Sequence, residues 1–294
     1  MACRQTPPAK THNLMFLHAH CISGPIQSRR LGTSLGVNLL PCSHKICNYN
    51  CIYCECGLNQ PDEEEIRSLP TPAQIETALD ERLRALKAEG RTLHSITFSG
   101  NGEPTLHPQF ETIMEIVCAL RQRHTPHTPV SVISNASRLG LPDIRRAIGR
   151  ADKRILKLDA GTGDLYGRIN GLRLSDPTLP ISEVAGRRET PTAAEIQTAY
   201  TRLIENLHDL PYPFTLQTLF FRGRAGGAPI DNTTGDELAA YIRQVLYIQP
   251  ADLMIYGLDR ETPEKDLQKL SEPELAALAH RLRAAGTPPV QYYY

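Results

Sequence analysis

The feature that most constrains the fold of this chain is a repeated alternation of short apolar segments and longer amphipathic ones. Apolar runs of this length, several rich in β-branched residues, are typical of strands buried on both faces. They lie at residues 34–40, 95–99, 130–135, 154–159, 214–221 and 253–258. The segments between them have apolar residues at helical spacing and begin with helix-start signals. Four of these signals are capping boxes, at Thr71 with Gln74, Thr192 with Glu195, Thr234 with Glu237 and Ser271 with Glu274, and two are the prolines Pro108 and Pro142.

Six strand–helix units predict an α/β fold with a parallel sheet and right-handed crossovers. The sheet is either an open doubly wound one or a barrel, and six units fall short of the eight of a complete barrel. We expect a loose extension over residues 1–22, a core domain over 23–290 and a disordered tail over 291–294. Residues 161–191 are too long for an ordinary connection and predict an inserted functional or mobile loop. The glycine-rich residues 223–232 predict a lid or a flexible excursion.

Polar and glycine-rich residues follow the predicted strands at the same end. The first strand leads into a cysteine-rich segment, residues 42–56, and the second leads into Gly-Asn-Gly-Glu-Pro at residues 100–104. Asn135 ends the third strand and Asp159 ends the fourth. Because the carboxyl ends of parallel strands meet at one edge of a sheet, these residues predict a single composite site.

The cysteine-rich segment predicts a metal centre. Five of the eight cysteines lie between residues 42 and 56, and Cys47, Cys51 and Cys54 form a C-x3-C-x2-C motif. Disulfides are disfavoured in a cytosolic chain of this size, whereas thiolates this close together suit an iron–sulfur cluster. Three ligands for a [4Fe–4S] cluster would leave one iron open to a small molecule. We interpret Cys42 and Cys56, which flank the motif, as ordinary buried cysteines.

A structural zinc site is the alternative. Cys51 and Cys54 form a C-x2-C pair that Cys42, His44, Cys47 or Cys56 could complete to a tetrahedron. Zinc ribbons usually draw on a second pair a dozen or more residues away, and the sequence has none. The spacing therefore favours iron–sulfur over zinc.

The C-x3-C-x-aromatic-C motif, with Tyr53 in the aromatic position, resembles the signature of the radical S-adenosylmethionine (radical SAM) superfamily. The resemblance implies that Cys47, Cys51 and Cys54 ligate a [4Fe–4S] cluster and that S-adenosylmethionine chelates the fourth iron. It further implies reductive cleavage to methionine and a 5′-deoxyadenosyl radical, which abstracts hydrogen from a substrate. The fold that it implies is a partial (β/α)6 TIM-like barrel, in agreement with the six units.

The same resemblance assigns further cofactor contacts. Residues 100–104 are similar to the family's glycine–glycine–glutamate motif, whose backbone binds the methionine amino group, although Asn101 replaces a glycine. Asn135 and Asp159 stand where the family contacts ribose and carboxylate, and Tyr256 is a candidate adenine contact. Gln217 is an amide in an apolar strand, and either the cofactor or a neighbouring strand would have to supply its partner. The implied cofactor-binding residues are Tyr53, Gly100, Asn101, Gly102, Glu103, Asn135, Asp159, Gln217 and Tyr256.

A narrower resemblance concerns the substrate. Residues 24–32, 54–57, 157–160 and 258–260 together are similar to a subgroup of Fe–S oxidoreductases that is related to the catalytic domain of wyosine-forming, tRNA-modifying enzymes. RNA is therefore a candidate substrate. The net charge of zero argues against a strongly basic nucleic-acid binder, although pairs such as Arg29 and Arg30 could meet a phosphate backbone.

No apolar run is long enough for a membrane span and no signal peptide is evident, so we expect a cytoplasmic protein. The chain shows no flavin or nicotinamide site, so an external electron donor such as flavodoxin or ferredoxin is required. Two non-enzymatic functions stay open as alternatives. They are a zinc-stabilised nucleic-acid-binding module and an iron–sulfur protein that only transfers electrons.

Overall fold

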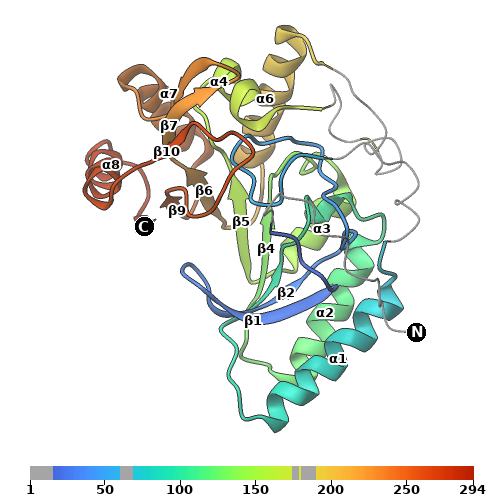
Figure 1. The fold of residues 1–294 in the computed structure, drawn as a ribbon. Coiled ribbons are helices and arrows are strands. Elements are labelled where there is room, and N and C mark those ends of the chain that lie inside the picture. The colour runs from blue at the N-terminus through green and yellow to red at the C-terminus, as the bar shows by residue number, and fades with distance from the viewer. Residues whose placement is uncertain (1–15, 60–68, 174–178, 180–189) are drawn as a thin grey trace.

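The computed structural model describes residues 16–59, 69–173, 179 and 190–294. Its centre is an eight-stranded curled sheet in the order β1-β2-β3-β4-β5-β6-β9-β11 (Figure 1). From β2 to β11 every neighbouring pair is parallel, and β1 is antiparallel to β2. The strands are β1 (Ile22–Ser28), β2 (Gly32–Val37), β3 (Ser95–Phe98), β4 (Val130–Ser134), β5 (Lys153–Lys157), β6 (Thr215–Leu219), β9 (Asp252–Tyr256) and β11 (Val290–Tyr293). The six predicted strands appear as β2, β3, β4, β5, β6 and β9, and the predicted partial barrel is confirmed.

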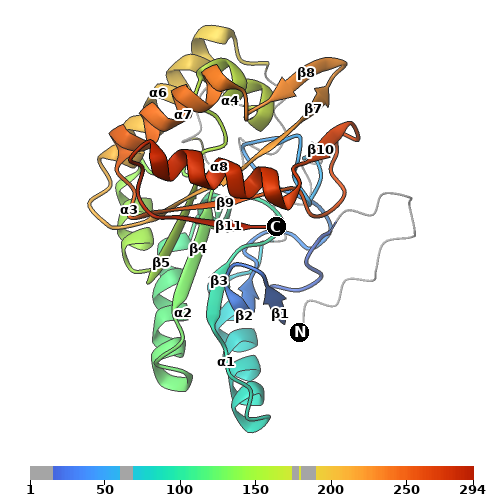
Figure 2. The same ribbon diagram turned by 90° about the vertical axis from the view of Figure 1, so that its left-hand side faces the viewer.

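Helices connect the parallel strands and pack their apolar faces against the sheet. In α1, for example, Ile75, Leu79, Leu83 and Leu86 are all buried. Helices α1 and α2 lie side by side in both views, and α8 packs on β9 and β11 (Figure 2). The helices are α1 (Pro72–Ala88), α2 (Phe110–His124), α3 (Pro142–Gly149), α4 (Gly163–Asn170), α6 (Ala193–His208), α7 (Gly235–Ile248) and α8 (Glu272–Ala284), with a 3-10 turn, η2, at Pro104–Leu106.

Three of the four predicted capping boxes form, at Thr71, Thr192 and Ser271. The fourth is wrong in part. The Thr234 hydroxyl accepts from the backbone N–H of Glu237, but the Glu237 carboxylate does not return to the helix start. It accepts instead from the backbone N–H groups of Gly161 and Thr162 and from the Thr162 hydroxyl. Glu237 therefore holds the loop that follows β5, because its carboxylate accepts all three of these hydrogen bonds.

Two segments that we expected to be irregular form strands. Residues 291–294 are not a disordered tail, since Val290–Tyr293 form β11 and extend the sheet beside β9. Valine and tyrosine favour strands, and this edge of the sheet offers unpaired backbone groups. The glycine-rich segment forms the hairpin of β7 (Phe221–Ala225) and β8 (Ala228–Asp231), which pairs with β10 (Leu267–Lys269) in a second sheet.

The other two irregular segments are also partly ordered. Within residues 161–191, the described part contains α4, and residues 174–178 and 180–189 lie outside the described residues. Of the expected N-terminal extension, residues 16–22 are described, and they are not loose. The His18 N–H donates to the Asn101 side chain at 2.8 Å, and the Phe16 N–H donates to the Glu55 carbonyl at 3.0 Å. These contacts fix the segment against the cysteine-rich loop.

The two ends of the curled sheet are joined by side chains. The turn between β1 and β2 carries Arg29 and Arg30. Arg29 forms a 3.0 Å ion pair with Asp259, which follows β9, and the Arg30 guanidinium lies 4.4 Å from the centre of the Tyr256 ring. The strand order places β1 at one edge of the sheet and β9 next to the other edge. The turn therefore reaches across the open flank of the partial barrel.

In the described part of the chain, the helices are all too short or too polar to cross a lipid bilayer.

Replacing Glu237 by alanine should lower the free energy of unfolding by about 2–4 kcal/mol. The change leaves two backbone N–H groups and a hydroxyl without their acceptor in a buried position. Urea denaturation followed by circular dichroism measures the loss. The exposed Glu205 on α6 is the matched control, and Glu205→Ala should change the free energy by less than about 0.5 kcal/mol. Equal losses in the two variants would contradict the role given to Glu237.

Candidate metal centre and adjoining pocket

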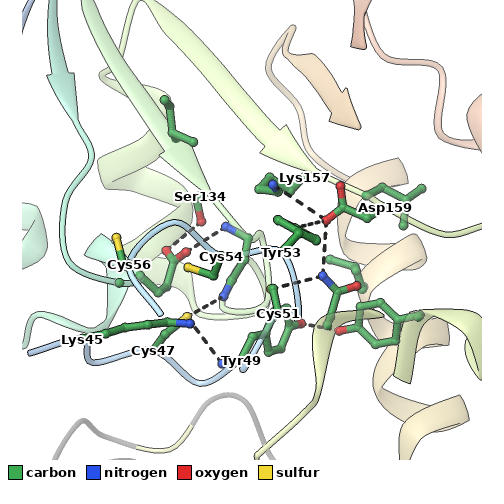
Figure 3. Close-up of a pocket in the computed structure, with 18 of the residues that line it drawn as sticks. Lys45, Cys47, Tyr49, Cys51, Tyr53, Cys54, Cys56, Ser134, Lys157 and Asp159 are labelled. Carbon is green, nitrogen blue, oxygen red and sulfur yellow. Dashed lines mark hydrogen bonds and ion pairs between the residues drawn. The ribbon is translucent and has the colours of Figure 1, made fainter. Parts of the chain in front are cut away.

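A pocket at the carboxyl ends of the strands brings most of the predicted site residues together. Its lining includes all three cysteines of the C-x3-C-x2-C motif, Gly100, Gly102, Glu103, Asn135, Asp159 and Tyr53 (Figure 3). These residues come from the loop after β2, the loop after β3 and the ends of β4 and β5. The pocket therefore assembles the composite site that the strand ends predicted.

The cysteine loop is held by the end of helix α4. The backbone N–H of Asn50 donates to the carbonyls of Asn170 and Gly171, at 3.0 and 2.9 Å, and the Ile52 N–H donates to the Ile169 carbonyl at 3.0 Å. The last carbonyls of a helix have no partner within the helix and need donors from elsewhere. The loop supplies those donors, so the helix end and the loop satisfy each other's backbone hydrogen-bonding groups.

The second support of the cysteine loop is the loop after β3. Ile46 and Gly102 form a parallel bridge, in which the Ile46 N–H donates to the Asn101 carbonyl and the Glu103 N–H donates to the Ile46 carbonyl. A Cβ atom on Gly102 would lie 1.7 Å from the Ile46 carbonyl oxygen, and its φ is +137°. Glycine is required here because both the contact and the backbone conformation exclude a side chain.

Asn101 does not direct its side chain into the pocket. The side chain is buried and accepts from the His18 N–H, and its amide nitrogen donates to the carbonyls of His18 and Pro41 at 3.0 and 2.8 Å. Its backbone N–H donates to Asn38. The residue that replaces the family's glycine thus anchors the N-terminal segment, and only its backbone belongs to the predicted cofactor loop.

Glu103 joins the ends of β3 and β4. Its carboxylate accepts from the Thr105 N–H and hydroxyl, from the Ser134 hydroxyl at 2.8 Å and from the Asn135 N–H at 2.7 Å. Burial raises the pKa of Glu103, and these donors oppose part of the rise. The carboxylate therefore orders the pocket wall.

Asn135 contacts the cysteine loop directly. Its amide nitrogen donates to Asn48 Oδ1 at 2.8 Å and lies 3.7 Å from Cys47 Sγ. Burial raises the pKa of the Cys47 thiol to about 12, and the positive charge of Lys45 opposes this rise. Asn135 thus places an N–H group next to one of the three predicted cluster ligands.

Asp159 is the centre of a buried network on the other wall. One carboxylate oxygen accepts from the Leu219 N–H at 3.0 Å. The other accepts from the Tyr53 hydroxyl and from the Asn170 amide at 3.2 Å, and lies 3.8 Å from Lys157 Nζ (Figure 3). Burial, followed by the charge of Asp159, raises the pKa of Tyr53 well above its usual value. Tyr53 therefore stays a neutral donor in this network.

Two predicted cofactor contacts, Gln217 and Tyr256, are not in the pocket lining. Gln217 is buried in β6 and its amide nitrogen donates to Met254 Sδ at 3.3 Å, so a neighbouring strand supplies its partner. The Tyr256 hydroxyl accepts from Lys157 Nζ at 2.9 Å, and Lys157 does line the pocket.

The structure adds two lysines that sequence reasoning missed, of which Lys45 is buried and Lys157 is partly buried. Lys45 lines the pocket beside the cysteines, and its Nζ donates to the Gly57 carbonyl at 3.0 Å. Burial lowers the pKa of Lys45, but the charges of Cys54, Cys47 and the other nearby thiols outweigh burial and raise it overall. Its position two residues before Cys47 was the available signal. Lys157, two residues before Asp159, is the second, and the charges of Asp159 and Tyr256 likewise outweigh burial and raise its pKa.

Cys56 also lines the pocket, and its Sγ donates to the Gly100 carbonyl at 3.5 Å. We expected an ordinary buried cysteine, whereas the thiol faces the same space as the motif cysteines. Cys42 lies outside this lining. The C-x-C spacing of Cys54 and Cys56 was the only sequence signal for this placement.

The residues present fit an iron–sulfur cluster. Three thiols on one loop face one pocket beside a buried lysine, which favours the thiolate form that binds metals. Within the described residues, no three histidine, cysteine, aspartate or glutamate side chains come close enough to hold a single metal ion.

Comparison with known families identifies this region. Residues 43–170 match the model of the Radical SAM superfamily, so the chain contains a radical SAM domain, as the cysteine motif predicted. The match begins at the cysteine loop and ends at Asn170, the last residue of α4. That family implies a [4Fe–4S] cluster and S-adenosylmethionine binding.

Curated relatives of the chain bear few functional names. A UPF0026 protein of Methanocaldococcus jannaschii is 33% identical over 147 residues, which cover 50% of this chain and 43% of the relative. A UPF0026 protein of Synechocystis is 28% identical over 249 residues, covering 84% of this chain and 78% of the relative. A Brachyspira hyodysenteriae protein named GTPase Obg is 35% identical over 149 residues, covering 51% of this chain and 20% of the relative. The chain thus spans less than half the length of several relatives that it matches.

Solved structures share the fold. A radical SAM methyltransferase from Sphaerobacter thermophilus superposes with a TM-score of 0.54 at 18% identity, covering 88% of this chain and 66% of the other. Streptococcus suis SuiB bound to S-adenosylmethionine gives a TM-score of 0.56 at 11% identity, covering 88% and 50%. At these identities the likeness establishes the fold alone.

Gly102→Ala should lower the free energy of unfolding by about 3 kcal/mol or more, because the added methyl group overlaps the Ile46 carbonyl and strains a positive φ. The variant should also take up less iron during anaerobic reconstitution, since the cysteine loop loses its partner. Thermal denaturation and iron analysis measure both effects. The matched control is Gly235→Ala, because a Cβ atom there meets nothing within 4 Å. A Gly102→Ala variant as stable and as iron-loaded as this control would contradict the packing argument.

Proposed function

We propose that the chain is a radical SAM enzyme with one [4Fe–4S] cluster held by Cys47, Cys51 and Cys54. The observation that supports this most is the shared pocket, in which the three thiols face the Gly100–Gly102 backbone and the Asp159 network. The family match over residues 43–170 includes all of these residues. When bound, the cluster and S-adenosylmethionine would supply an electron and a 5′-deoxyadenosyl radical for hydrogen abstraction.

In this proposal, the pocket residues of the protein have distinct roles in holding the cluster and the cofactor. The backbone at Gly100 and Gly102 would face the methionine part of the cofactor. The missing Cβ atoms make room for Asn38 and the Ile46 carbonyl, which hold this loop in place. Asn135, Asp159 and Tyr53 form polar walls that suit the ribose and carboxylate groups. Glu103 orients Asn135 through its backbone N–H. Lys45 balances the negative charge of the thiolates.

In this proposal, Gln217 and Tyr256 do not contact the cofactor directly. The Tyr256 hydroxyl holds Lys157, which borders the pocket, and the Gln217 amide donates to Met254 on the neighbouring strand. We assign them to support of the pocket floor, not to direct adenine binding. Residues 23–290 are proposed as the radical SAM core.

The substrate, the electron donor and the location are proposed at a coarser level. A small redox protein such as flavodoxin or ferredoxin would deliver the electron in the cytoplasm. RNA is the first substrate class to examine, because the narrower sequence resemblance points to tRNA-modifying enzymes. Arg29 and Arg30 at the open flank would offer positive charge to a phosphate backbone, although Arg29 is paired with Asp259 here.

Anaerobic reconstitution with iron and sulfide tests the proposal. We expect the protein to bind about four irons and four sulfides per chain, and to form 5′-deoxyadenosine after addition of dithionite and S-adenosylmethionine. Cys51→Ala should reduce 5′-deoxyadenosine to background, because one iron loses its ligand. Cys118 lies on α2 beside Met114 and Arg150, and Cys118→Ala should behave like the wild type.

Each alternative function predicts a different result. A colourless protein with bound zinc would favour the structural zinc module. A stable cluster whose paramagnetic resonance spectrum does not respond to S-adenosylmethionine would favour an electron-transfer protein. Either outcome would contradict the enzyme proposal.

A further inference from the structure

Asn170 occupies an unusual position in the pocket. It is the last residue of α4, its side chain is 4% exposed, and it lines the pocket between Cys51 and Asp159. Its amide nitrogen lies 3.4 Å from Cys51 Sγ and donates to Asp159 Oδ2 at 3.2 Å. One side chain therefore contacts both a predicted cluster ligand and the carboxylate network.

The orientation of the Asn170 amide is fixed by its neighbour. The Oδ2 atom of Asp159 accepts hydrogen bonds from Tyr53 and from Asn170, and Lys157 lies beside the same atom. An ionised carboxylate can only accept, so the amide of Asn170 must turn its nitrogen toward it. The carbonyl oxygen then points the other way. It is buried and has no hydrogen-bond partner among the residues that the structure describes.

A buried carbonyl oxygen without a donor is costly, and native proteins rarely keep one unless a ligand or water completes it. Asn170 lines the same pocket as the three thiols and the Gly100–Gly102 backbone. A ligand that completes it has to present an N–H or O–H group. S-Adenosylmethionine carries N–H groups on its ammonium and adenine amino nitrogens and O–H groups on its ribose.

We propose that Asn170 is a cofactor-binding residue with two functions. Its carbonyl oxygen accepts a hydrogen bond from an N–H or O–H group of S-adenosylmethionine, and its amide N–H stabilises the thiolate of Cys51. This inference rests on the proposed function, and it deepens that function by assigning a contact that no sequence motif marked. It ties cofactor binding and the electronic state of the cluster to one side chain.

The second function has a direct physical consequence. A hydrogen bond to a ligating sulfur stabilises the extra negative charge of the reduced cluster and thereby raises its reduction potential. The Asn170 N–H should act in this way on Cys51. Removing it should make the cluster harder to reduce, and this effect requires no S-adenosylmethionine and no turnover.

The test compares Asn170→Leu and Asn170→Ala with the wild type. Leucine keeps most of the volume and alanine adds no bulk, and both leave the backbone contacts of residue 170 with Asn50 in place. Asn206→Leu is the matched control, because Asn206 is an α6 asparagine outside the pocket that accepts from Arg145. Circular dichroism and iron analysis establish that each variant is folded and carries its cluster.

Two measurements then separate the two functions. A redox titration monitored by electron paramagnetic resonance, without S-adenosylmethionine, should show a lower midpoint potential in both Asn170 variants and no shift in the control. Anaerobic calorimetry should show S-adenosylmethionine binding about tenfold more weakly, as expected for one lost buried hydrogen bond. Methionine carries only the ammonium group, whereas 5′-deoxyadenosine carries the ribose hydroxyls and the adenine amino group. The ligand that loses affinity therefore identifies which half of the cofactor supplies the donor.

Each negative result has one meaning. An unchanged potential in both variants would overturn the assigned effect on Cys51. Unchanged affinities for all three ligands would overturn the carbonyl contact. A wild-type protein that forms no cluster, or a cluster that does not respond to S-adenosylmethionine, would contradict the proposed function itself and is recognised before any variant is made.

Discussion

The backbone contact between Ile46 and Gly102 is the interaction on which the site depends. It places the cysteine loop against the loop after β3, and the missing side chain of Gly102 lets the two backbones meet. The end of α4 supports the same loop from the other side through Asn50. The thiols therefore take their positions from main-chain hydrogen bonds on two sides, which side-chain rotation cannot disturb.

Two lysines place positive charge close to the cysteine loop. Lys45 lies among the thiols, and Lys157 lies between Asp159 and the Tyr256 hydroxyl. Lys45 is buried and Lys157 is partly buried, yet both keep a raised pKa because negative partners surround them. Two fixed cations thus face a centre whose ligands are anionic, and the low-dielectric surroundings strengthen that attraction.

The sequence predicted the fold well and indicated which three cysteines face one pocket, because both depend on local spacing. Apolar runs, helix-start signals and the C-x3-C-x2-C motif are visible without knowing which residues meet in space. The wrong expectations arose where distant partners decide. Glu237 looked like part of a capping box, but its carboxylate binds the loop after β5. The side chain of Asn101 binds the backbone of His18, and the cofactor contact predicted for the Asn101 backbone stays a prediction.

Residues whose contact partners lie far away in the sequence could not be predicted from local patterns, for the same reason. Asn170 lies 119 positions from Cys51 in the sequence, and no spacing rule connects the two. The strand β11 was missed because its tyrosines form no alternating pattern, and only the edge of β9 orders them. Topology, not composition, determines these placements.

The turn between β1 and β2 has a consequence for access to the barrel interior. The flank beside it is closed by the exposed Arg29–Asp259 ion pair and by Arg30 on Tyr256, and not by strand pairing. Such a closure can widen without breaking a backbone hydrogen bond of the sheet. Dissolved ions screen exposed ion pairs, so a higher salt concentration should weaken the contact between Arg29 and Asp259 on this flank.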